Sequence, residues 1–102
     1  MLYQQHCANC HGLDGRGLGT LMPPLAGADY LVRQRAALPG IVRHGLRGPL
    51  VVNGIRYDGI MPGLPPEKLA DADVANILNY VRRAWGNHAP DLITVQEVEA
   101  AR

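Results

Sequence analysis

The sequence predicts a single, mostly α-helical domain with one small β-hairpin and long connecting loops. Three observations predict this fold class. The chain has 102 residues, which is the size of one domain. Apolar residues recur with helical spacing near the C-terminus, and an Asn-Gly pair between two β-prone runs indicates a hairpin. Twelve glycines and eight prolines leave much of the remaining chain to loops.

The N-terminal third is expected to be a helix followed by loops. The helix covers about Leu2–Cys10. Residues 15–19 read Gly-Arg-Gly-Leu-Gly, but their spacing is wrong for a dinucleotide-binding loop and no strand precedes them. Glycines here would instead let the backbone pass close to a flat ring. Residues 22–27, Met-Pro-Pro-Leu-Ala-Gly, predict a stiff, extended stretch.

Two short helices are expected next. Asp29 stands where it can cap a helix from Tyr30 to about Ala37. Pro39 suits the first turn of another helix, which ends at His44.

The C-terminal half holds the hairpin and the strongest helix. The hairpin covers Leu50–Tyr57, with Asn53-Gly54 as a type I′ turn. The helix runs from about Asp71 to Trp85, with Asp71 as its cap and Gly86 at its end. Thr94 and Glu97 form a capping box for a last short helix. The apolar face of the strong helix consists of Val74, Ile77, Leu78, Val81 and Trp85.

Residues 7–11 carry the chemistry. They read Cys-x-x-Cys-His, which is the attachment signature of a c-type haem. Thiols three residues apart lie on one side of a helical turn, so Cys7 and Cys10 can each bond to a haem vinyl group, and His11 can bind the iron. A dithiol pair or a zinc site are the alternatives. Dithiol motifs normally lie near a βαβ pattern, and zinc commonly takes two paired motifs, whereas this chain has two cysteines in all.

The composition agrees with one covalently attached haem c. The chain has no Phe, one Trp and four Tyr, a poor inventory for a self-sufficient core. A covalently held apolar macrocycle would supply the missing core. The formal net charge of +1 gives no basic excess of the kind that indicates nucleic acid. No apolar run is long enough to span a membrane.

Met61 is the predicted second axial ligand. It lies in Ile-Met-Pro-Gly, and the proline and glycine would hold the loop that presents its sulfur. A thioether opposite an imidazole stabilises ferrous iron. Met22, His44 and His88 are rivals, and Met61 could instead fill a gap in the core. With both axial positions taken, the iron has no open site for a substrate, so we expect an electron carrier and not an enzyme. A haem enzyme or gas sensor with an open sixth position is the alternative function.

These residues resemble the class I cytochromes c, and the resemblance covers nearly the whole chain. Residues 23–27, Pro-Pro-Leu-Ala-Gly, resemble the family's P-x-L-x-G stretch. The resemblance implies the cytochrome c fold, with helices and loops wrapped around one haem. It also implies that the Pro23 carbonyl accepts a hydrogen bond from His11, that Leu25 belongs to the haem-binding residues, and that Met61 is the distal ligand. Tyr3 matches the aromatic at the crossing of the terminal helices.

A narrower resemblance concerns the partner. Residues 48–62 and the segment from Trp85 to Val98 are similar to cytochrome domains fused to copper nitrite reductases or forming subunits of dehydrogenases. This similarity implies a monomeric domain or subunit that exchanges electrons with a periplasmic redox protein. The chain begins without the charged and apolar regions of a signal peptide, and its first helix begins only six residues before Cys7. We therefore expect a mature chain, a trimmed chain or a domain cut from a longer protein, with a shortened first helix.

Five arginines and no acids stand between Asp29 and Asp58. Arg47, Arg56 and Tyr57 flank the hairpin that leads to Met61, so we expect them near the haem propionates. For the other three, namely Arg33, Arg35 and Arg43, we expect a solvated surface.

Overall fold

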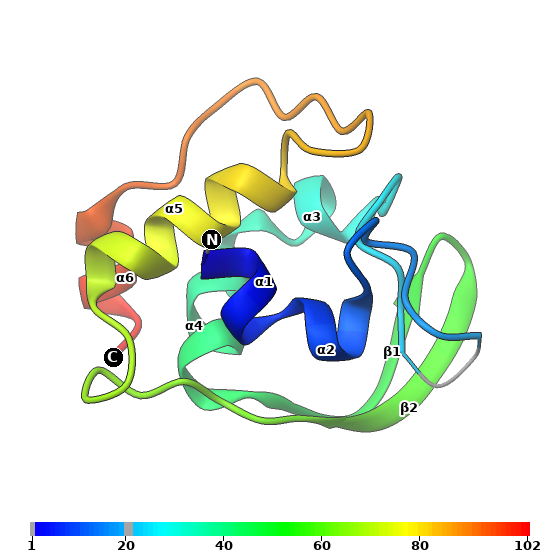
Figure 1. Ribbon diagram of the computed structural model, residues 1–102, viewed down its shortest axis with the longest axis horizontal. Coiled ribbons are helices and arrows are strands. Elements are labelled where there is room, and N and C mark those ends of the chain that lie inside the picture. The colour runs from blue at the N-terminus through cyan, green and yellow to red at the C-terminus, as the bar shows by residue number, and fades with distance from the viewer. Residues whose placement is uncertain (1, 20–21) are drawn as a thin grey trace.

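The computed structural model describes residues 2–19 and 22–102, apart from the side chains of residues 9 and 10. Short helices and one hairpin alternate along the chain (Figure 1). The helices are α1 (Leu2–His6), α2 (Ala8–His11), α3 (Tyr30–Arg33), the 3₁₀ helix η1 (Arg35–Ala37), α4 (Leu38–His44), α5 (Asp71–Val81) and α6 (Val95–Ala100). The strands are β1 (Leu46–Val52) and β2 (Ile55–Met61). The predicted class, helices and loops with a small hairpin, is confirmed.

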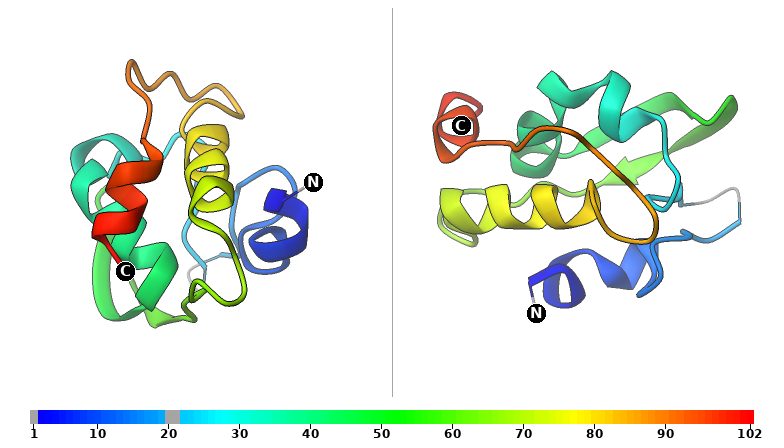
Figure 2. Two further views of the ribbon diagram at one scale, coloured as in Figure 1. Left: turned by 90° about the vertical axis from the view of Figure 1, so that its left-hand side faces the viewer. Right: turned by 90° about the horizontal axis from the view of Figure 1, so that it is seen from above.

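Helix α5 is the centre of the arrangement. Figure 2 shows α1 on one side of α5 and α4 with α6 on the other. The buried face of α5 consists largely of residues that the helical spacing predicted, namely Val74, Ile77, Leu78 and Val81. The hairpin lies at the far end of the molecule from α6 (Figure 1). Among the described residues, no helix is both long enough and apolar enough to cross a lipid bilayer.

The hairpin forms with the predicted turn and is longer than expected. Its strands pair antiparallel from Val52–Ile55 to Leu46–Met61. Asn53 and Gly54 both have positive φ, 54° and 78°, as a type I′ turn requires. The extra pairs matter because they carry the ladder to Met61 itself.

The predicted helix ends differ at three places. The first helix is interrupted at Cys7, and the helix expected over Tyr30–Ala37 is interrupted at Gln34, whose φ of −109° is not helical. The predicted end of α5 at Trp85 is wrong, because the helix stops at Val81. The Asn87 side chain donates a hydrogen bond of 2.7 Å to the Val81 carbonyl and so satisfies the helix end there.

Two of the three predicted caps are wrong. Thr94 and Glu97 form the capping box at α6 as expected. Asp71 is the first residue of α5 and not its cap; its carboxylate is buried and binds Arg43 and Arg102 instead. Asp29 stands at the cap position of α3, but its carboxylate accepts the Asn53 backbone N–H at 2.8 Å. In both cases a distant partner has taken the oxygen that a local cap would have used.

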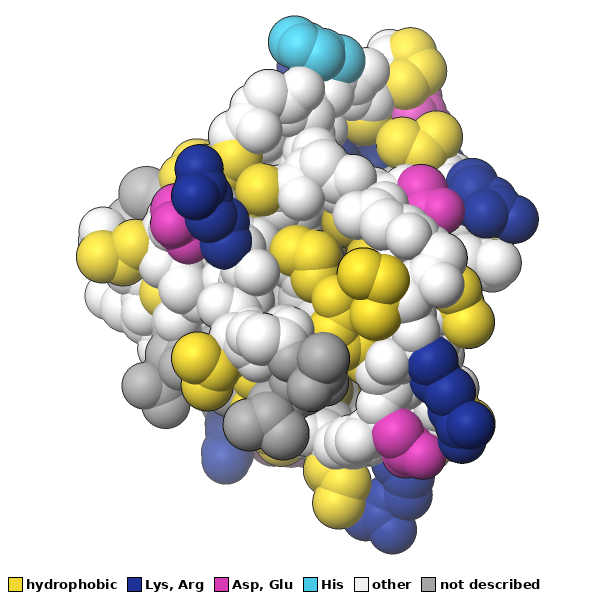
Figure 3. Space-filling model, turned by 90° about the vertical axis from the view of Figure 1, so that its right-hand side faces the viewer, with side chains coloured by type: hydrophobic (Ala, Val, Ile, Leu, Met, Phe, Trp, Pro, Cys, Tyr) yellow, Lys and Arg dark blue, Asp and Glu magenta, His cyan; other side chains and the backbone are white. Residues whose placement is uncertain are grey.

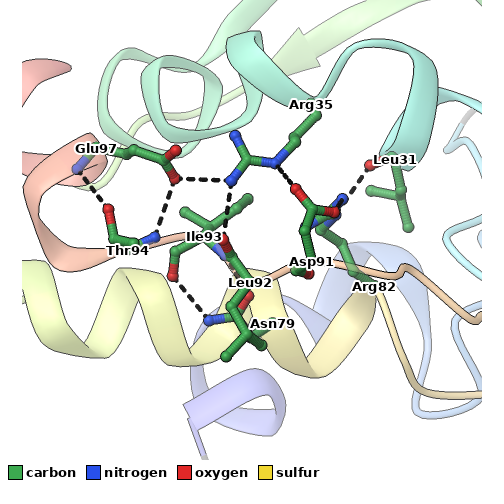
Figure 4. Close-up of polar contacts among 9 residues, drawn as sticks. All are labelled: Leu31, Arg35, Asn79, Arg82, Asp91, Leu92, Ile93, Thr94 and Glu97. Carbon is green, nitrogen blue, oxygen red and sulfur yellow. Dashed lines mark hydrogen bonds and ion pairs between the residues drawn. The ribbon is translucent and has the colours of Figure 1, made fainter.

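The expectation of a solvated surface holds for Arg33 and is wrong for Arg43. The Arg43 side chain is fully buried against Asp71. Arg35 is partly buried and joins η1 to the C-terminal segment through Asp91, the Leu92 carbonyl and Glu97 (Figure 4). These partners are 28 to 62 residues away along the chain, which is why local sequence gave no sign of them.

Candidate haem site

His11 is held by a backbone carbonyl. It is the last residue of α2 and is buried, and its Nδ1 lies 2.9 Å from the Pro23 carbonyl oxygen. A carbonyl can only accept, so Nδ1 must donate, and in the neutral ring the lone pair is then on Nε2. This is the protonation state in which an imidazole can bind a metal, with the carbonyl fixing the ring orientation. The hydrogen bond implied by the family resemblance is thus present.

Glycines bring the Pro23 carbonyl to His11. The Gly17 N–H donates to the His11 carbonyl at 2.8 Å, and a Cβ at Gly17 would lie 2.2 Å from the Met22 carbonyl oxygen. Gly15 accepts hydrogen bonds from the N–H groups of Leu25 and Ala26. Because both glycines have positive φ and no room for a side chain, only glycine fits at either position.

We expected the glycine loop to pass close to a flat ring. At Gly15 the ring is the indole of Trp85. A Cβ at Gly15 would lie 2.6 Å from the Trp85 indole, so the backbone rests directly on that ring. Trp85 has a φ of 53° and turns back from the end of α5 toward the N-terminal loop, where its Nε1 donates to the Leu13 carbonyl.

Tyr3 joins α1 to α5, as expected for the aromatic at the helix crossing. Its ring is buried, with centroids 5.7 Å from Tyr80 and 5.0 Å from Trp85. Its hydroxyl donates a hydrogen bond of 2.6 Å to the Gly12 carbonyl, the residue directly after His11. Tyr3 therefore ties α1, the helix before the haem-binding motif, to both α5 and the His11 turn.

An apolar cavity opens beside His11, between the loop after α2, the hairpin, α4 and α5. Its lining is Cys7, His11, Met22, Pro23, Pro24, Leu25, Ala28, Tyr30, Leu31, Leu38, Ile41, Val42, Leu46, Leu50, Val52, Tyr57, Gly59, Ile60, Met61, Pro62, Ile77, Leu78 and Val81. Figure 3 shows apolar side chains gathered in the middle of the face formed by the hairpin and the neighbouring loop, with charged side chains around them.

The structure brings most of the predicted site residues to this cavity. Cys7, His11, Pro23, Leu25, Tyr57 and Met61 line it. The side chain of Cys10 lies outside the described residues. Arg47 and Arg56 are exposed and are not among the lining residues. Arg47 follows Leu46 in β1, and since Leu46 faces the cavity, Arg47 lies on the other face of the strand. Arg56 forms an ion pair with Asp58. Their assignment to the propionates stays a prediction.

The rival axial ligands lie in different places. Met22 lines the cavity too, next to Pro23. His44 is exposed and its Nε2 donates to the Ala101 carbonyl at 2.7 Å, and His88 is exposed. Neither histidine lines the cavity.

Sequence reasoning missed two contributions to the site. One wall comes from α4, through residues such as Leu38 and Val42, which form no clear periodic face in so short a helix. The other is Asn87, whose amide donates to the Leu25 carbonyl at 3.0 Å and accepts from the Gly27 N–H at 2.8 Å. Asn87 thereby fastens the stretch after Pro23 to the end of α5.

Residues 1–85 match the sequence model of the cytochrome c family. The chain belongs to the cytochrome c family. Haem c, attached covalently and holding iron, is therefore its cofactor, and electron transfer is its function. The residues present fit that group, since a thiol and a metal-binding imidazole face an otherwise apolar cavity. The zinc and dithiol alternatives are set aside.

The chain is similar to a cytochrome c-552 and to cytochrome c subunits of dehydrogenases. Cytochrome c-552 of Thermus thermophilus is 37% identical over 90 residues, which are 84% of this chain and 66% of that protein. The cytochrome c subunit of a quinone-dependent alcohol dehydrogenase of Gluconacetobacter polyoxogenes is 33% identical over 102 residues, 98% of this chain and 21% of the subunit. The cytochrome c subunit of gluconate 2-dehydrogenase of Pantoea cypripedii is 30% identical over 113 residues, covering 99% of this chain and 23% of that subunit. The chain thus spans about a fifth of the dehydrogenase subunits.

Proposed function

We propose that His11 and Met61 bind the haem iron from opposite faces and that this domain carries electrons to or from a periplasmic redox enzyme. The hydrogen bond from His11 to Pro23 carries the proposal, because it leaves Nε2 free to bind a metal in an apolar cavity. Iron with both axial positions filled by His and Met changes oxidation state with little change in its bonding.

The position of Met61 favours it over Met22. Met22 directly precedes Pro23, whose carbonyl accepts from Nδ1, so it belongs to the loop on the His11 side of the cavity. Met61 comes from a different element, the end of the hairpin, where pairing with Leu46 holds its backbone. The two axial ligands lie on opposite faces of a flat ring, so the origin of Met61 outside the His11 loop supports its assignment over Met22.

Electrons would enter and leave at the face shown in Figure 3. Three apolar residues, Leu13, Leu18 and Ile60, are strongly exposed, at 67%, 61% and 68%. They lie in the loop after the haem-binding motif and beside Met61. A small apolar contact that releases readily suits a transient electron-transfer complex.

The charges near this face are largely paired. Arg16 lies 3.6 Å from Asp14, Arg56 lies 3.5 Å from Asp58, and Arg33 lies 3.3 Å from Asp29. Paired charges produce little long-range field, so we propose a partner that docks through an apolar patch and is not steered by opposite charge. The cytochrome subunits among the relatives make a dehydrogenase our first candidate for that partner. A nitrite reductase, which only the sequence resemblance suggests, is the second.

Absorption spectra of the haem-loaded protein test the axial ligands. The chain would be expressed with a periplasmic signal and the haem-attachment machinery. The ferric protein should show the weak far-red band of a sulfur–iron bond. Met61→Ala should abolish the band, whereas Met22→Ala, the matched control from the same cavity, should keep it. Haem attachment without the band in the unmodified protein would contradict Met61 ligation and favour an enzyme or sensor with an open position.

A further inference from the structure

We propose that Arg43 is a positioning residue that keeps Met61 at the haem site by holding the chain that follows it. This inference rests on the proposed ligation by Met61. Met61 ends β2, and the next regular element, α5, begins ten residues later at Asp71. This connection, residues 62–70, contains no helix or strand. Some other interaction must fix it, because a free connection would let the end of the hairpin fray and carry the sulfur away.

The Arg43 guanidinium spans this connection. Its Nη1 donates to the Leu64 carbonyl at 2.9 Å and to the Leu69 carbonyl at 2.6 Å, and its Nη2 binds the Asp71 carboxylate. The side chain is fully buried, so these charge-assisted bonds are shielded from water. One side chain of α4 thus fastens the middle and the end of the connection to the start of α5.

The backbone at the end of α4 also contacts the connection close to Met61. The Leu64 N–H donates to the Val42 carbonyl at 2.7 Å. A Cβ at Gly63 would lie 2.5 Å from the Arg43 carbonyl oxygen, and a Cβ at Gly45 would lie 2.3 Å from the Met61 carbonyl oxygen. The end of α4 and the chain from Met61 to Leu64 are therefore in direct backbone contact on both sides of Arg43. In Figure 1 the connection runs beneath α4 along the lower edge of the molecule.

The consequence is a specific coupling. The Met61 sulfur can leave the iron only when the connection opens, and opening breaks the bonds to Arg43. Arg43 then controls how easily the sixth position is exposed to other ligands, although its guanidinium does not line the cavity. A purely structural arginine would change the stability of the whole domain without this selective effect.

Arg35 provides the matched control. Like Arg43, it joins distant segments through three partners, but these are Asp91, the Leu92 carbonyl and Glu97, and none of them belongs to the connection (Figure 4). Arg43→Met, Arg43→Lys and Arg35→Met would be prepared with haem attached. Stopped-flow absorption would give the rate at which imidazole displaces the sulfur from the ferric protein. Unfolding by denaturant would give each variant's global stability.

We expect both Arg43 variants to take up imidazole at least about tenfold faster than the unmodified protein, since each loses at least one buried charge-assisted bond. Their far-red band should weaken. Arg35→Met should lose stability and keep the native uptake rate. Equal uptake rates for Arg43→Lys and the unmodified protein would overturn the proposal. A missing far-red band in the unmodified protein would instead refute Met61 ligation, so the two failures are distinguishable.

Hydrogen exchange of the unmodified protein gives a second test that needs no variant. The Leu64 amide, bound to Val42, reports on the connection. The Ile93 amide, which donates to the Asn79 side chain at 2.8 Å, reports on the segment between α5 and α6. Saturating imidazole should reduce the protection of Leu64 at least about tenfold and leave Ile93 unchanged. Unchanged protection of Leu64 would show that the sulfur leaves without opening the connection, which would refute the coupling.

Discussion

Replacing Tyr3 by Phe tests how the N-terminal helices are fixed to the rest of the molecule. The substitution keeps the ring between Tyr80 and Trp85 and removes only the hydroxyl that donates to the Gly12 carbonyl. Burial raises the pKa of Tyr3, so in the native protein this hydroxyl stays protonated and donates at any ordinary pH. Gly12 is half-buried, so water can partly replace the lost donor. We therefore expect a cost near the middle of the range for a hydrogen bond, about 1 kcal/mol.

For a domain of this size that cost lowers the melting temperature by roughly 4–8 °C. Tyr3→Ala, which also empties the space between the two rings, should cost about 3–5 kcal/mol. Guanidinium denaturation of the haem-loaded proteins, followed by far-ultraviolet circular dichroism, measures both changes. A Phe variant as stable as the native protein would show that the hydrogen bond contributes nothing. A Phe variant as unstable as the Ala variant would show that the ring contacts are not what holds α1.

Three further predictions concern the loop, acid stability and docking. Gly15→Ala should lower the free energy of unfolding by about 1–3 kcal/mol more than Gly27→Ala does. Both glycines have positive φ, but only a Cβ at Gly15 would clash with Trp85. Equal melting temperatures of the two variants would contradict this. The Arg102 guanidinium, with a second arginine, lowers the pKa of Asp71 from 3.8. The Asp71 carboxylate thus binds a proton more readily in the unfolded chain than in the folded one. The free energy of unfolding should therefore be constant above about pH 5 and fall below pH 4. Asp71→Asn should make the melting temperature depend less on pH in this range. The second-order rate constant of electron transfer with the partner should change less than about threefold between low salt and ~0.2 M salt; a steeper fall would indicate steering by unpaired charge.

Features whose signals lie within a few residues were predictable from sequence. The type I′ turn depends on Asn53 and Gly54 alone, and the α6 capping box depends on Thr94 and Glu97. The haem-binding motif is equally local. In each case the chemistry that forms the structure is contained in the pattern, so no distant contact can override it easily.

The end of α5 could not be predicted, because a later residue decides it. The apolar spacing continues from Val81 to Trp85, and nothing in that spacing indicates a stop. The stop depends on the Asn87 side chain, which reaches back to the Val81 carbonyl. The chain then turns Trp85 over Gly15, a contact between residues 70 positions apart. Periodicity correctly indicated that Trp85 packs against the core, where it is partly buried, but assigned it to the wrong element.

The buried arginines follow from the same shortage that the composition revealed. The chain has no Phe, and much of its aliphatic inventory lines the haem cavity and so cannot fasten one segment to another. Several segments of irregular backbone are joined instead by guanidinium groups bonded to backbone carbonyls. Arg82, 2% exposed, binds the Leu31 and Asp91 carbonyls, and Arg43 binds those of Leu64 and Leu69. A guanidinium offers five donors in a fixed plane, so one side chain can bind carbonyls from two or three segments of irregular backbone. An apolar side chain at the same place would leave those carbonyls without hydrogen bonds.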